Sequence, residues 1–319
     1  MRCLAGWTIP FLLANFSGIL PPMKRSIIVR LTGLVLALLG AWAAYTQTPQ
    51  QGKQAPAAAD PPPPFNLVKV SDDLYVIDGG RAGNVAVYVT SEGLILVDDK
   101  YEQHFDEIMA NVKKVSPLPI KYLINTHYHA DHSGGNTHFA AITQIISTSM
   151  ARKNIVNKVQ SNAPAGMIPA NVTFDQELSV FLGGKEVRAR YMGRGHTGTD
   201  AFVLFPALRV IHSGDMMTNG SPLIDYPGGG SVVEWTKTLD KVMQLEWDTV
   251  IPGHGPVSKK ADMLTYRNNV EKLRNRAQGL IRQGKAQAEV GAVMMAEFNW
   301  QPDSLNMQWS LPGMMTELK

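Results

Sequence analysis

Three histidines and one aspartate lie within six consecutive positions of this 319-residue chain. They are His127, His129, Asp131 and His132, and they follow the apolar run 122–124. Because side chains alternate along an extended segment, His127 and His129 point to the same side and can bind one ion. Asp131 and His132 follow where a helix is expected to begin, so they can face a second ion. Imidazole and carboxylate are the usual zinc ligands, so this segment predicts a centre for one or two divalent metal ions.

Three further polar residues lie next to glycines at the ends of predicted strands. They are His196, Asp215 and His254, and the last two closely follow apolar runs. Glycine lets the backbone turn sharply and approach a ligand closely. Any one of these residues alone would be interpreted as an ordinary loop residue. Together with the histidine-rich segment they form a repeated pattern, which indicates that they supply the remaining metal ligands.

The order of these motifs resembles that of the metallo-β-lactamase-fold hydrolase superfamily from about Phe65 to Pro256. The resemblance implies an α/β fold, a four-layer αββα sandwich with metals at one edge of two facing sheets. It also implies seven metal ligands in three groups: His127, His129 and His196 on one ion; Asp131, His132 and His254 on the other; and Asp215 between them. Asp98, after the strand expected at 94–97, matches an acidic position that would orient the histidine ligands.

The ligand set also bears on the substrate. One subclass of lactamases has a thiolate in the second metal site and another generally lacks the bridging aspartate, whereas this chain has Asp215 and no cysteine there. The full set is more similar to hydroxyacylglutathione hydrolase (glyoxalase II), to lactonases and to periplasmic quinoprotein relay system hydrolases. The segment 223–231 is similar to the last group. The resemblance therefore implies the fold and the chemistry more sharply than the substrate.

The chemistry implied by the resemblance is hydrolysis of an ester, thioester, lactone or β-lactam by a hydroxide that bridges two divalent ions. Asp131 is expected to steer that hydroxide and to accept its proton. Zinc is the expected metal, and iron or manganese also suit a site without thiolate ligands. Two alternatives stay open: a β-lactamase acting on antibiotics, and a mononuclear iron sulfur-oxidising dioxygenase. The intact ligand set disfavours a non-catalytic binding protein of the same fold.

The first 44 residues are predicted to be a secretory signal peptide. They contain four basic residues and no acidic ones, an apolar run at 31–39 and an alanine-x-alanine cleavage pattern at 41–43. The apolar run is shorter than the roughly 20 residues of a membrane span. Met23 is a candidate for the true start of translation. We therefore expect a periplasmic or secreted protein without stable membrane insertion after cleavage.

Residues 45–64 are rich in proline and alanine and predict an extended linker. The domain expected after it spans 65–319 and ends in helices. Without the four basic residues of the leader, 26 basic side chains remain against 27 acidic ones. The net positive charge of the whole chain therefore does not indicate nucleic-acid binding. A small-molecule substrate is the expected partner, and the oligomeric state stays open.

Strands and helices alternate around the candidate ligands. Apolar runs and turn residues predict strands at 74–77, 85–89, 94–97, 122–125, 145–147, 187–191, 201–205, 208–211 and 249–251. Helical spacing and capping residues predict helices at 105–115, 148–159, 231–244, 258–283 and 287–298. Lys100 and Arg194 are interpreted as solvated charges, and Trp309 as a packing residue. The loop 161–170 is expected to reach over the site.

Overall fold

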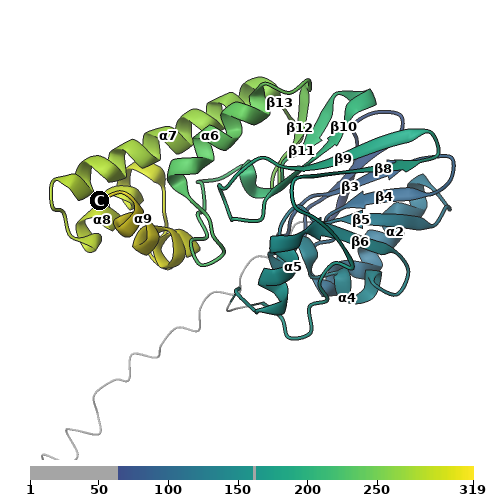
Figure 1. Cartoon of the computed structure of the whole chain (residues 1–319), viewed down its shortest axis with the longest axis horizontal. Coiled ribbons are helices and arrows are strands. Elements are labelled where there is room, and N and C mark those ends of the chain that lie inside the picture. Colours follow the sequence, from purple (N-terminus) through teal and green to yellow (C-terminus); the bar gives the residue numbers. More distant parts are fainter. Residues whose placement is uncertain (1–63, 161–162) are drawn as a thin grey trace, which may run out of the picture. The chain divides into compact units, whose positions relative to one another are not determined.

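The computed structural model describes residues 64–160 and 163–319. The predicted signal peptide and nearly all of the predicted linker lie outside the described residues, so their boundaries stay predictions. In the described ranges two sheets face each other and helices cover both outer sides (Figure 1). The predicted four-layer αββα sandwich is therefore confirmed. None of the helices in these ranges is long and apolar enough to cross a membrane.

The first sheet contains seven strands in chain order. They are β1 (Asn66–Lys69), β2 (Leu74–Asp78), β3 (Val85–Val89), β4 (Leu94–Val97), β5 (Ile120–Ile124), β6 (Gln144–Thr148) and β7 (Val172–Phe174). Neighbours are antiparallel from β1 to β4 and parallel from β4 to β7. Parallel strands need crossover connections, which usually contain helices. These are α2 (Phe105–Val115) after η1 (Glu102–His104), then α3 (Ala130–Ser133) with α4 (Asn136–Phe139), then α5 (Ser149–Val156).

The second sheet has six strands in a different spatial order. They are β13 (Ser258–Lys259), β12 (Thr249–Ile251), β11 (Val210–His212), β10 (Ala201–Phe205), β9 (Lys185–Tyr191) and β8 (Glu177–Leu182). Only β11 and β12 run parallel in this sheet, and α6 (Val232–Met243) lies between them in the sequence. Two short helices flank β11: η2 (Pro206–Leu208) and η3 (Gly214–Met216).

Alternating side chains divide the strands of the first sheet between two apolar layers. Val85 and Val87 of β3 belong to the cluster that includes Ile108 of α2. Tyr88, on the other face of β3, belongs to the cluster between the sheets, where its ring lies 5.1 Å from that of Phe205 in β10. Strands with apolar residues on both faces are typical of a sheet that is covered on both sides. This burial explains why the predicted strands are continuous apolar runs.

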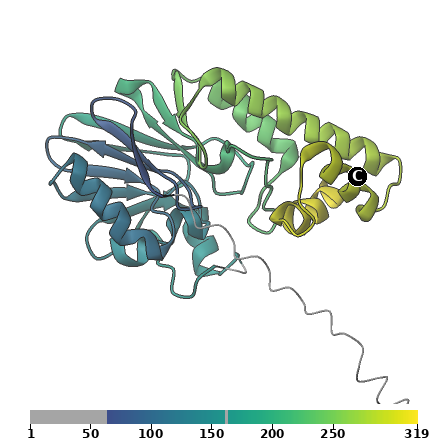
Figure 2. The same cartoon turned by 180° about the vertical axis from the view of Figure 1, so that it is seen from behind.

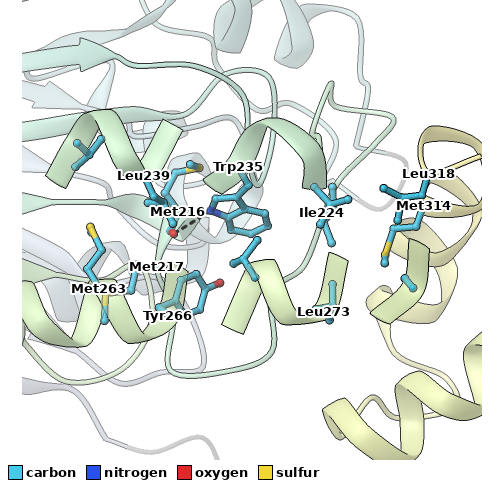
Figure 3. Packing of buried hydrophobic residues seen from close by; sticks show 14 of the residues in the cluster. Met216, Met217, Ile224, Trp235, Leu239, Met263, Tyr266, Leu273, Met314 and Leu318 are labelled. Atoms are coloured by element: carbon cyan, nitrogen blue, oxygen red, sulfur yellow. Dashed lines mark hydrogen bonds between the residues drawn. The ribbon is translucent and has the colours of Figure 1, made fainter. Parts of the chain in front are cut away.

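The outer face of the second sheet packs on the C-terminal helices. These are α6, α7 (Lys260–Arg282), α8 (Gln287–Phe298) and α9 (Leu311–Glu317). Figure 2 shows α7 as a long helix extending from the sheets to α8 and α9. Trp235 of α6 is fully buried in this layer, and its Nε1 donates to the carbonyl of Met216 at 3.2 Å (Figure 3). The Trp235 side chain thus holds the layer of C-terminal helices against the loop that follows β11.

Several predicted boundaries differ from the structure. The helix predicted at 258–283 begins at Lys260, because residues 258–259 pair with β12 as β13. The strand predicted at 208–211 begins only at Val210, after the 3-10 turn η2. The strands β1, β7 and β8 and the terminal helix α9 were not predicted. β8 has only one buried residue, Val180, and its apolar residues are mixed with Glu177 and Ser179, so its sequence signal is weak.

Candidate metal centre

The seven candidate ligands lie on loops and short helices that follow strands of both sheets. His127 and His129 follow β5, and Asp131 and His132 lie in α3 immediately afterwards. The remaining three belong to the second half of the chain: His196 in the β9–β10 connection, Asp215 in η3 after β11, and His254 after β12. The structure brings all seven together at one edge of the sandwich, where their ligand atoms form three overlapping groups.

The first group consists of three buried imidazoles, those of His127, His129 and His196. His129 Nδ1 lies 3.2 Å from His127 Nε2 and 3.0 Å from His196 Nε2. Burial and the neighbouring imidazoles lower the pKa of His127 well below its usual value, so this ring is neutral. Nitrogen lone pairs that face one another at such distances suit a shared cation, and zinc takes three histidine ligands in this way.

The second group joins Asp131, His132 and His254. His254 Nε2 lies 3.1 Å from Asp131 Oδ2 and 3.2 Å from His132 Nε2. These three ligand atoms, one carboxylate oxygen and two imidazole nitrogens, are therefore close enough together to coordinate the same ion. His254 is the most exposed of the three, with a third of its side chain accessible, so the group opens toward solvent.

Asp215 lies between the two groups. Its Oδ1 is 3.2 Å from His132 Nε2, and its Oδ2 is 3.7 Å from His196 Nε2. The Oδ1 atom is buried, yet within the described part of the chain it accepts no hydrogen bond of good geometry. A buried carboxylate oxygen without a partner is costly, and a cation on each side would satisfy both oxygens. The donor set therefore fits two divalent ions.

The protonation of the second group has a clear electrostatic origin. Burial lowers the pKa of His254, but Asp215 and Asp131 more than reverse this and raise it to about 9. Burial raises the pKa of Asp131, but His132 and His254 more than reverse this and hold it well below its usual value. Protons on the two histidines thus balance the carboxylates. A divalent ion would take the place of those protons, because metal binding requires neutral imidazoles.

The ring nitrogens that face away from the centre also have partners in His127, His196 and His132. Two of these contacts involve a sequence neighbour or the backbone: His127 Nδ1 is 3.0 Å from Thr126 Oγ1, and His196 Nδ1 is 2.7 Å from the carbonyl of Leu223. His132 Nδ1 is 2.8 Å from Asp98 Oδ2. A proton held on the far nitrogen leaves the near nitrogen with its lone pair directed at the centre. Asp98 lies where its predicted supporting role requires it.

Sequence reasoning missed a second buried carboxylate, that of Asp225. Its Oδ2 lies 2.9 Å from His129 Nε2 and also accepts from the Tyr128 hydroxyl, while its Oδ1 accepts from Gly228 N at 3.0 Å. Burial raises the pKa of Asp225, but the contacts with His129 and Tyr128 more than compensate and lower it. The turn-forming run of glycines after Asp225 was the only local signal. Asp225 therefore contacts the outer nitrogen of His129 as Asp98 contacts that of His132.

Two interpretations of charged and aromatic residues were wrong. Lys100 is fully buried rather than solvated, and its Nζ donates to the carbonyls of Gly79 and Gly83 at 3.0 and 2.7 Å. Trp309 does not only pack: it lines a cavity of about 430 Å³ over the metal centre, and its ring lies 5.9 Å from that of His129. Arg194 is exposed as predicted, with its guanidinium bonded to backbone carbonyls.

The predicted covering loop also differs from expectation. Within the described residues of this loop, Ala163 to Met167 line a second cavity, of about 410 Å³, together with Tyr128 and Lys158. Gln160 lines both cavities. Its Oε1 accepts from the backbone N–H of Ala130, at 3.0 Å, beside the metal ligands. Gln160 therefore marks the boundary between the metal cleft and this neighbouring cavity.

Comparisons with known proteins agree with this fold. Residues 78–254 match the family model of the metallo-beta-lactamase superfamily. The chain is 28% identical over 203 residues to the metallo-beta-lactamase type 2 of Elizabethkingia meningoseptica, covering 60% of this chain and 79% of that protein. It is 26% identical over 198 residues to metallo-beta-lactamase IND-1 of Chryseobacterium indologenes, covering 60% and 80%. Among solved structures, the metallo-beta-lactamase from Pontibacter korlensis matches with a TM-score of 0.56 at 17% identity, covering 65% of this chain and 99% of that one.

Proposed function

Because this chain belongs to the metallo-beta-lactamase superfamily and is a metal-dependent hydrolase, we propose that it uses two zinc ions to cleave the acyl bond of a small molecule. The observation that carries the proposal is the position of Asp215 between two groups of ligand atoms. The basic and apolar leader with its alanine-x-alanine pattern supports export, so we propose that the protein acts in the periplasm or outside the cell.

The proposed ligands follow the two groups. His127, His129 and His196 would hold one ion, and Asp131, His132 and His254 the other, with Asp215 between them. When bound, such ions supply a Lewis acid for the carbonyl oxygen and a water that ionises near neutral pH. Asp98 and Asp225 would keep the ligand rings in the required tautomer and orientation, through their contacts with His132 and His129.

Asp131 is the proposed catalytic residue. One fifth of its side chain is accessible, and it lines the cleft beside His254. Its lowered pKa keeps it ionised near neutral pH, so its carboxylate can orient the attacking water, and we propose that it also accepts the proton of that water. The leaving group can then take up that proton as it departs. Because the attacking group would be a water and Asp131 its proton acceptor, the proposed reaction needs no serine or cysteine nucleophile.

Two other functions make different predictions. The names of the relatives, at 26–28% identity, favour β-lactams as substrates. A mononuclear iron dioxygenase would need only one group of ligands. The close approach of Asp131, His132 and His254 to one another therefore favours two ions and hydrolysis over that alternative.

The first test combines metal content with turnover. The purified protein would be analysed for zinc, iron and manganese, and the same preparation assayed with a 4-nitrophenyl ester, a thiolactone and nitrocefin. Two zinc ions per chain with chelator-sensitive hydrolysis of any of these substrates would support the proposal. One iron per chain without hydrolysis would refute it and favour the dioxygenase. Rapid cleavage of nitrocefin alone would identify the protein as a β-lactamase.

A further inference from the structure

One wall of the metal cleft comes from a segment outside the region that matches the family model. That match ends at residue 254, whereas Leu305, Asn306 and Trp309 all line the cleft. Asn306 and Trp309 lie in the π-helical turn η4 (Asn306–Ser310), directly before α9. Short π-helical turns are frequent at functional sites. The substrate-facing wall is therefore a feature of this chain rather than of the matched domain.

This wall is held firmly against the loop that carries Asp225. The Asn306 side-chain amide donates to the carbonyl of Pro222 at 2.7 Å. The buried Ser310 hydroxyl accepts from Ile224 N at 2.8 Å and donates to the carbonyl of the same residue at 3.0 Å. The anchored backbone presents Trp309 to the cleft, with its ring 5.9 Å from that of the ligand His129. A rigidly held tryptophan next to the reacting centre is suited to select substrates.

The charged residues that line the cleft also bear on the kind of substrate. Among the described residues that line it, none is lysine or arginine. The charged side chains that line it are Asp131, Asp215 and His254, all three candidate metal ligands, and its other walls include the neutral side chains of Tyr101, Leu305 and Trp309. Lys100 is buried on backbone carbonyls and so does not reach the cleft.

We propose that the natural substrate is a neutral ester or lactone whose apolar or aromatic group packs on Leu305 and Trp309. The proposal rests on the function proposed above and narrows it. β-Lactam antibiotics and glutathione thioesters both carry carboxylates, and a carboxylate packed on Leu305 and Trp309 would find no lysine or arginine among the described residues that line the cleft. Hydrolysis adds water across the acyl C–O bond and gives a carboxylic acid and an alcohol. The wall formed by Leu305 and Trp309 offers no lysine or arginine that would retain the anionic product.

The first test uses two esters of nearly the same shape. These are 4-nitrophenyl 4-methylbenzoate and its 4-carboxy analogue, each assayed with the zinc-loaded protein and corrected for spontaneous hydrolysis. The expected kcat/KM is at least about tenfold higher for the neutral ester, because the carboxylate loses hydration without gaining a partner. An equal or higher kcat/KM for the carboxylate overturns the proposal. So does a carboxylate preference that disappears in Lys158→Ala, which would place an anion site in the neighbouring cavity.

A charge introduced into the wall should change this preference. Leu305 is 36% exposed, so Leu305→Arg adds a cation without opening the core. The expected result is a gain of about tenfold in kcat/KM for the carboxylate relative to the neutral ester, with unchanged metal content. Leu264→Arg is the matched control, since Leu264 is 47% exposed on α7 and does not line the cleft. An unchanged ratio in Leu305→Arg, or an equal change in both variants, overturns the proposal.

A binding measurement separates this inference from the proposed function. The anilide analogues of both esters would be titrated into the zinc-loaded protein by calorimetry. The neutral anilide is expected to bind at least about tenfold more tightly than the carboxylate, and Trp309→Ala to abolish most of this difference while Trp309→Phe retains it. Binding with this preference but without ester hydrolysis refutes the proposed function alone. Tighter binding of the carboxylate, or no effect of Trp309→Ala, refutes the neutral-substrate inference.

Discussion

Replacing Asp225 by asparagine tests how the structure sets the first metal group. Asp225 Oδ2 lies 2.9 Å from His129 Nε2, while His129 Nδ1 lies within 3.2 Å of the two other imidazoles of that group. The carboxylate accepts a hydrogen bond from Nε2–H, so Nδ1 keeps its lone pair for the metal. An asparagine NH2 turned toward His129 favours the opposite tautomer, in which Nδ1 carries the proton and cannot bind an ion.

The expected magnitude follows from similar contacts in other metal sites. Loss of a hydrogen-bond partner behind a ligand typically costs 10–100-fold in metal affinity, which corresponds to about 1.4–2.8 kcal/mol. Zinc affinity would be measured by competition with a chromophoric chelator. Asp248→Asn is the control, because Asp248 is exposed and paired with Arg209. Unchanged zinc affinity in Asp225→Asn would refute the tautomer argument, and a loss of folding, monitored by near-UV circular dichroism, would have to be excluded first.

Four further changes probe the centre and its support. Asp215→Ala should reduce bound zinc from two ions to at most one by elemental analysis and lower turnover at least about tenfold; two retained ions would contradict the bridging position. Gly253→Ala would place a methyl 1.9 Å from Asp215 Oδ1, so zinc affinity should fall although no ligand is changed, and unchanged affinity would contradict this geometry. Because the pKa of His254 is raised to about 9, zinc must displace a proton below that pH, so affinity should rise with pH from 7 to about 9 and calorimetry should detect proton release; a flat profile would disprove this. Trp235→Ala should lower the free energy of unfolding by about 3–5 kcal/mol and lose the bond to Met216, as chemical denaturation would show; a loss below about 1 kcal/mol would mean that the helical layer is not anchored there.

The candidate ligands could be predicted because their signals are local. Four of them lie within one short segment, and Asp215 and His254 each follow an apolar run closely. The residues that support them could not be predicted in the same way. Asp225 is separated from His129 by 96 positions, and only the fold shows that their side chains meet. The supporting role of Asp98 came from the family resemblance rather than from any pattern in its own neighbourhood.

The fold was predictable where burial is complete and less so where it is partial. β3, β4 and α2 were predicted within one or two residues, because their apolar spacing matches the geometry of the element. Lys100 was misread because a charged residue signals solvent unless its partners are known, and here the partners are backbone carbonyls. Trp309 was misread for the opposite reason: an aromatic residue signals a core, and only the anchored turn η4 directs it to the cleft.

The distribution of the ligands along the chain ties folding to metal supply. The Nε2 atoms of His132 and His254 are 3.2 Å apart although the residues are 122 positions apart in the sequence, so an ion held by both would close a long loop and join the two sheets. The unfolded chain offers no such preformed pair, so bound ions would stabilise the native state, by about 4 kcal/mol at free metal concentrations of 1,000 times the dissociation constant. Without zinc, a larger fraction of the chains would be unfolded at the edge that carries His132 and His254, where proteases can cleave them. Zinc starvation should therefore lower the steady-state amount of this protein as well as its activity.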